Sequence, residues 1–137
     1  FNKREEIQMD QIRQTVAMLG EQIRQSNAYR EYVEADALYH ADAPLQALVG
    51  EFNKARQTLM DERSAGEKDM AKIEQAQKSM QELYDRIMKS EVAQAAVQKQ
   101  AAYDKFLQQV YNLINFEING EDAGGCSGGC ASCSGCH

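Results

Sequence analysis

The sequence predicts an all-α protein: a helical bundle of about five helices, two long and three shorter, followed by a Gly- and Cys-rich C-terminal tail. Apolar residues recur at steps of three and four from position 12 to position 114, and no stretch alternates as a strand does. The chain has one proline, and six of its nine glycines stand at or after position 120, so long helices can run uninterrupted before that point. All four cysteines lie within the last twelve residues.

The first half of the chain predicts three helices. The first ends near Gln25 and carries one apolar face, made of Ile12, Val16, Leu19 and Ile23. Ser26 and Asn27 are good N-cap residues for a second helix, which carries Tyr29, Tyr32, Val33 and Leu38. A third helix is expected from Asp42-Ala43-Pro44, because Asp caps helices and Pro suits the first turn. Its apolar residues are Leu45, Leu48, Val49, Phe52, Leu59 and Met60.

The second half predicts two more helices. Gly66 marks a break, and Ser64-Ala65-Gly66-Glu67 matches the capping-box pattern for a fourth helix with Met70, Ile73, Met80, Leu83, Tyr84 and Ile87. Ser90-Glu91 caps a fifth, long helix, whose stripe is Val92, Ala96, Tyr103, Phe106, Leu107, Val110, Leu113 and Ile114. Asn119-Gly120 is predicted to end it, because both residues tolerate the left-handed conformation. We therefore expect a helical domain over residues 1–119 and a tail over residues 120–137.

Composition narrows the class of protein. The chain has 137 residues, 43% hydrophobic and 26% charged, which suits one globular domain. Its net charge of −6 repels a phosphate backbone, so we expect no direct nucleic-acid binding. No stretch approaches the roughly 20 apolar residues that span a bilayer. The first residues hold no apolar signal core, so the expected location is the cytoplasm.

Partners are expected, and catalysis is not. The apolar stripes exceed what one small bundle needs to bury, which favours homo- or hetero-oligomerisation. For any single residue, burial within the chain is the simpler interpretation. The sequence has no His-Glu-x-x-His pair and no Gly-rich phosphate loop, and the acid pairs Glu5-Glu6 and Asp61-Glu62 suit exposed helix surface. We therefore expect that the protein is not an enzyme.

The tail is the candidate binding site. Cys126, Cys130, Cys133 and Cys136 follow the spacing C-x3-C-x2-C-x2-C among Gly and Ser residues. Without a secretion signal, four thiols favour metal binding over disulfides. A [4Fe–4S] cluster suits such short spacers best, since structural zinc usually takes two C-x2-C pairs across a longer spacer. The alternatives are a zinc site that makes the tail a structural or interaction module, a thiol-based carrier that passes on a cluster or metal, and free or redox-paired thiols. His137 is an open candidate for a further ligand.

Residues 5–118 resemble the YlbF/YmcA family of small helical bacterial regulators. The resemblance lies in residues 26–32 and 43–52, in the segment that leads from Ser90 to Tyr103, and in residues 106–110 and Ile114. It implies a non-catalytic protein that assembles with paralogous helical regulators and influences RNase Y-dependent RNA processing, and through it competence, sporulation and biofilm formation. Family members with C-terminal cysteines use them in [4Fe–4S] binding, which the resemblance carries to Cys126, Cys130, Cys133 and Cys136. It also implies that a cluster can be shared between chains.

Overall fold

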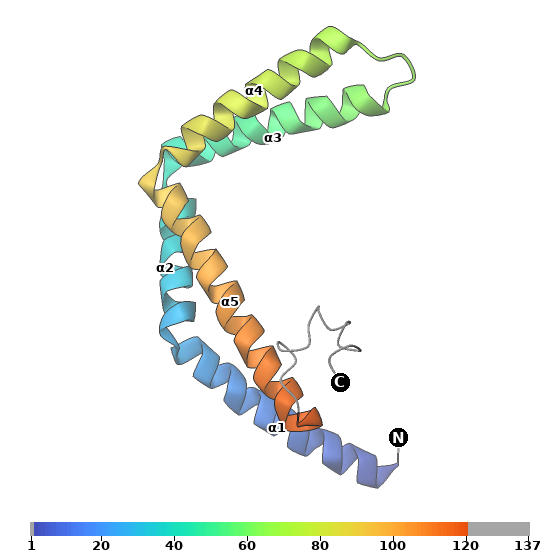
Figure 1. Cartoon of the computed structure of the whole chain (residues 1–137), viewed down its shortest axis with the longest axis vertical. Coiled ribbons are helices and arrows are strands. Elements are labelled where there is room, and N and C mark those ends of the chain that lie inside the picture. Colours follow the sequence, from blue (N-terminus) through green and yellow to red (C-terminus); the bar gives the residue numbers. More distant parts are fainter. Residues whose placement is uncertain (1, 121–137) are drawn as a thin grey trace, which may run out of the picture. The chain divides into compact units, whose positions relative to one another are not determined.

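The computed structural model describes residues 2–120, which form five helices and no strand. These are α1 (Lys3–Gln25), α2 (Asn27–Ala41), α3 (Ala43–Ser64), α4 (Met70–Met88) and α5 (Glu91–Asn119), as Figure 1 shows. The predicted all-α fold is confirmed. The chain divides into two compact units between Lys99 and Gln100, within α5. The helix α5 ends at Asn119, and the tail beyond Gly120 lies outside the described residues, so the domain boundary between residues 119 and 120 stays a prediction.

A single residue, Ser26, joins α1 to α2. Its backbone is extended, with φ −71° and ψ 152°, so the helical path is interrupted there. The Ser26 hydroxyl accepts a hydrogen bond from the Tyr29 amide at 3.2 Å and donates one to the Ile23 carbonyl at 2.6 Å. One side chain thus satisfies backbone groups at the end of α1 and at the start of α2, and the predicted N-cap is confirmed.

Asp42 connects α2 to α3 in the same way. Its carboxylate accepts from the Leu45 amide at 3.0 Å, and Pro44 occupies the first turn of α3, as the sequence predicts. The Gln46 side-chain amide reaches back and donates to the Tyr39 carbonyl at 2.8 Å, near the end of α2. Polar side chains therefore stabilise both helix ends at a one-residue junction.

Replacing Asp42 with Ala is expected to lower the free energy of unfolding by about 1 kcal/mol, because the α3 amides lose their cap. Urea titration followed by far-ultraviolet circular dichroism measures the change. Glu51→Ala is the matched control, since Glu51 is an exposed acid on α3 that caps nothing. Equal losses in the two variants would show that the cap contributes nothing specific.

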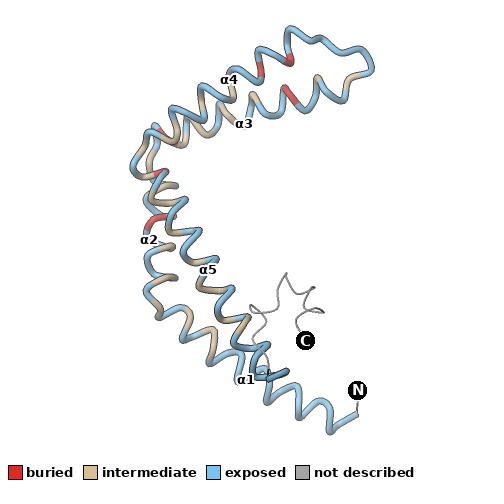
Figure 2. The backbone as a smooth tube through the Cα atoms, viewed as in Figure 1, coloured by how far each residue is buried: buried red, intermediate tan, exposed pale blue. Residues whose placement is uncertain are grey.

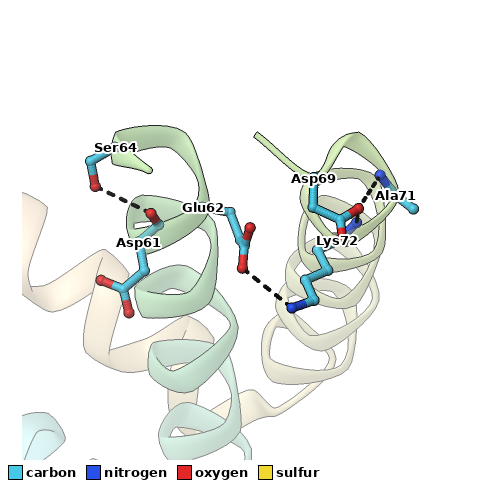
Figure 3. A network of polar contacts seen from close by, with 6 residues as sticks. All are labelled: Asp61, Glu62, Ser64, Asp69, Ala71 and Lys72. Atoms are coloured by element: carbon cyan, nitrogen blue, oxygen red, sulfur yellow. Dashed lines mark hydrogen bonds and ion pairs between the residues drawn. The ribbon is translucent and has the colours of Figure 1, made fainter. Parts of the chain in front are cut away.

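The turn between α3 and α4 differs from the prediction. The predicted capping box at residues 64–67 is wrong. The helix α4 begins at Met70, and its N-cap is Asp69. The Asp69 carboxylate accepts hydrogen bonds from the Ala71 and Lys72 amides. Figure 3 shows this cap beside the ion pair of Lys72 and Glu62, 3.8 Å apart across the turn. The Ser64 hydroxyl instead donates to carbonyls of its own helix, so it closes α3 rather than opening α4.

The start and end of α5 follow the prediction. The Ser90 hydroxyl accepts from the Ala93 amide at 3.2 Å, and the Gln94 side chain donates to the Met88 carbonyl at 2.6 Å. At the other end, Gly120 has φ +73° and its amide donates to the Phe116 carbonyl. A residue with a side chain is strained at that φ, which explains the glycine at this helix stop.

The buried core of the described chain is small. The helices α3 and α4 lie side by side as an antiparallel pair (Figure 1), and between them Leu59, Ile73 and Ala76 form a buried cluster against which Met80 packs. Figure 2 shows the buried positions as short isolated stretches. The other buried residues are Ala35, Leu45 and Ala93, and no polar or charged residue among those described is buried.

Candidate functional site

The four predicted ligands, Cys126, Cys130, Cys133 and Cys136, lie outside the described residues. Within residues 2–120, no three or more His, Cys, Asp or Glu side chains are grouped so that they could hold a metal ion. The structure therefore locates the attachment of the tail, at the Gly120 stop of α5, and leaves the proposed ligand set as a prediction.

The N-terminal helix α1 exposes its apolar face. None of its residues is buried, and the side chains of Ile12 and Val16 are 54% and 58% exposed. Leu19 and Ile23, further along the same face, are half-buried. Met9, which sequence reasoning missed, extends the face by one more step of three, so the steps from Met9 to Ile23 are three, four, three and four. This spacing is typical of a helix that packs along one seam against another helix.

The C-terminal part of α5, taken by itself, also exposes apolar side chains. Leu113 is 63% exposed and Ile118 is 72% exposed, and Tyr111, Ile114 and Phe116 are exposed as well. Leu113 and Phe116 line a shallow groove with Gln109 and Asn112. The cysteine tail follows directly after this surface in the sequence. A protein that covered this part of α5 would therefore bind beside the point where the tail begins.

A second groove lies between α2 and the first turns of α5. Its floor is apolar and its edges are charged; the lining residues are Glu31, Glu34, Ala35, Leu38, Glu91, Val92, Ala95 and Lys99. One ion pair crosses it, with the Lys99 ammonium 2.6 Å from a Glu31 carboxylate oxygen. Sequence reasoning missed this site, because these partners lie 68 positions apart and no local motif links them.

A third groove lies on the α3–α4 pair. It is lined by neutral side chains: Phe52, Leu59, Gln77, Met80, Gln81 and Tyr84. Tyr84 is exposed, whereas Leu59 belongs to the buried cluster, so the groove opens directly onto the core.

In the described part of the chain, no helix is both long enough and apolar enough to cross a membrane.

Comparison with known proteins places these helices in a family. The sequence profile described as "Control of competence regulator ComK, YlbF/YmcA" matches residues 12–119, from the apolar face of α1 to the last residue of α5. Neither the curated proteins nor the solved structures give a match to the chain. Because the profile covers most of the sequence, with α1 from Ile12 onward and all of the other four helices described, the chain belongs to the YlbF/YmcA family of competence-control regulators.

Proposed function

We propose that this protein is a non-catalytic, cytoplasmic regulatory adaptor that acts by binding other proteins. The observation that carries the proposal is the apolar face of α1, on which Met9, Ile12 and Val16 are exposed and Leu19 and Ile23 are half-buried. Apolar surface in water costs roughly 25 cal/mol per Å², so an exposed seam of this length favours association with a second helical surface. The family membership supports a role in regulation, since the family is described as controlling a competence regulator.

The partners proposed are helical proteins of the same family and RNase Y, in an RNA-processing complex that influences competence, sporulation and biofilm formation. The adaptor would contact protein and no nucleic acid, because its net charge is −6 and α1 carries four acidic against four basic residues. The apolar seam of α1 could be buried against a second copy of the chain or against another protein. Sedimentation measures which complex forms.

The tail is proposed to hold a [4Fe–4S] cluster through Cys126, Cys130, Cys133 and Cys136. The donor set fits, because four thiolates are the usual ligands and small Gly and Ser spacers would allow backbone amides to hydrogen-bond cluster sulfurs. When bound, the cluster would make the tail sensitive to iron supply and to redox state. Cys₄ zinc is the alternative, and it would give a structural site without that sensitivity.

The adaptor function predicts that charges on the α1 seam abolish partner binding. In the double variant Ile12→Glu/Val16→Glu, two carboxylates would have to lose water on assembly, so we expect at least a tenfold weaker complex. Sedimentation velocity of the full chain, alone and mixed with its paralogues and RNase Y, measures this. The matched control is Gln14→Glu/Ala17→Glu, which adds the same charge to exposed positions of α1 away from the seam.

The control variant should assemble like the wild-type protein, and circular dichroism should give equal helix content for all three. Assembly that survives the seam charges would contradict the role of α1. A wild-type protein that sediments as a free monomer in every mixture would contradict the adaptor function itself.

A further inference from the structure

The groove between α2 and α5 runs along both helices for about two turns. On α2 its residues are spaced by three, one and three positions, at Glu31, Glu34, Ala35 and Leu38. On α5 they are Glu91, Val92, Ala95 and Lys99, which also follow one helix face. Two turns of helix are about 10 Å long. A trough of this length between two helix ridges has the form that a third helix fills.

Half of the net charge of −6 arises in the short segment that forms the α2 side of this groove. Residues 26–42, which include α2, hold four acidic side chains and one basic one, Arg30. In residues 3–25 there are four of each sign, and in residues 43–89 there are eight of each. The acidic excess is therefore divided between residues 26–42 and residues 90–137, which hold five acidic and two basic side chains. The first of these regions supplies the α2 side of the groove.

The acids on the groove edges are only partly neutralised. Glu31 is paired with Lys99, but Glu34 and Glu91 are exposed and make no ion pair with any residue between 2 and 120. Between these carboxylates lie the buried Ala35 and Leu38, whose side chain is 57% exposed. The exposed side chain of Leu38 therefore lies near carboxylates that have no ion-pair partner among residues 2–120. A ligand with an apolar side chain and a basic side chain would cover Leu38 and pair with a carboxylate.

We propose that this groove docks a helical segment of a partner protein that presents an aliphatic side chain flanked by Lys or Arg. The aliphatic side chain would cover Leu38 and Ala35, and the basic side chains would pair with Glu34 and Glu91. The inference rests on the proposed adaptor function, and it adds the chemistry of the partner. The same face of a second copy is a poor occupant, because two acidic edges would meet.

The probe for the test is a synthetic amphipathic helical peptide with leucines on one face and lysines beside them. Titrated into the full ¹⁵N-labelled chain, it should shift the amide signals of Ala35, Leu38, Val92 and Ala95. Fluorescence anisotropy should give a Kd at least ten times higher for Glu34→Lys than for the wild type. Glu74→Lys is the matched control, since Glu74 is an exposed acid on α4 that makes no ion pair with the described residues and does not line the groove. The Kd of this variant should not change.

Two more peptides separate charge from apolar contact: one with Glu in place of Lys, and one with Gln in place of Leu. Both should bind at least tenfold more weakly than the first. Leu38→Gln in the protein provides a second variant, at an exposed position whose change does not disturb the core. Equal binding of the acidic and basic peptides, or equal Kd values for Glu34→Lys and Glu74→Lys, would overturn the proposal. Groove signals that shift with chain concentration and not with the peptide would identify a second copy as the occupant and would also overturn it.

The failure of this inference is distinct from the failure of the adaptor function. If Glu34→Lys assembles with the family paralogues and RNase Y as tightly as the wild type, the groove is not the docking site and the adaptor function stands. If the wild-type chain assembles with none of them, the adaptor function is wrong.

Discussion

Replacing Cys130 with Ser is expected to remove nearly all bound iron and sulfide from protein purified without oxygen. A [4Fe–4S] cluster is held by four cysteine thiolates, and a serine hydroxyl is a far poorer ligand for iron at neutral pH. The tail has no fifth cysteine that could replace the missing one. Chemical analysis of iron and sulfide, together with visible absorbance, measures the loss.

The matched control for this prediction is Ser132→Ala, which changes the same tail without removing a thiol. It should keep the wild-type content of about four iron and four sulfide atoms per cluster. A colourless wild-type protein that contains stoichiometric zinc would contradict the iron–sulfur assignment. The alternative Cys₄ zinc site would then be the correct interpretation of the tail.

Replacing Ile73 with Ala is expected to lower the free energy of unfolding by about 2–4 kcal/mol. Ile73 is 6% exposed and lies in the cluster that holds α3 against α4. The described chain has few buried side chains, so few other contacts can offset the cavity. Urea titration by circular dichroism measures the change, as for Asp42→Ala.

The control is Ile7→Ala, the same substitution at a side chain that is 53% exposed on α1. It should change the free energy of unfolding by no more than about 0.5 kcal/mol. If the two variants lost equal stability, the cluster of Leu59, Ile73 and Ala76 would not be the principal core.

The helix junctions could be predicted from the sequence because their chemistry is local. Ser26, Asp42 and Ser90 each accept a hydrogen bond from an amide three positions later, and the sequence names all three as caps. The one wrong cap was the box at residues 64–67. Asp69 is a second candidate for the N-cap of α4, and the choice between it and Ser64 depends on the length of the turn.

The core could not be predicted in the same way. A stripe of apolar residues shows which face of a helix is apolar, but not which helix covers it. Ile12 and Val16 belong to a clear stripe and are exposed, whereas Ala35 and Ala93 are buried without standing out in the sequence. Small residues are buried where helices approach closely, and that approach depends on the tertiary arrangement.

The α2–α5 groove could not be predicted from the sequence for a related reason. Its floor and edges come from two segments that only the fold brings together, with Glu31 and Lys99 as the link. Charge counted along the chain gives a useful signal in retrospect: residues 26–42 carry four acidic side chains against one basic one, an excess that residues 3–25 and 43–89 lack.

The proposed adaptor function and the proposed cluster lead to one joint expectation: partner binding should change when the tail loses its cluster, since the tail follows directly after the exposed apolar part of α5. The most direct test is the affinity of the full chain for its family partners and RNase Y, measured by sedimentation with the iron–sulfur form and with the chelator-stripped form. The account predicts that the two forms differ at least tenfold in Kd, and that Cys130→Ser behaves like the stripped form. Equal affinities for all three would contradict it.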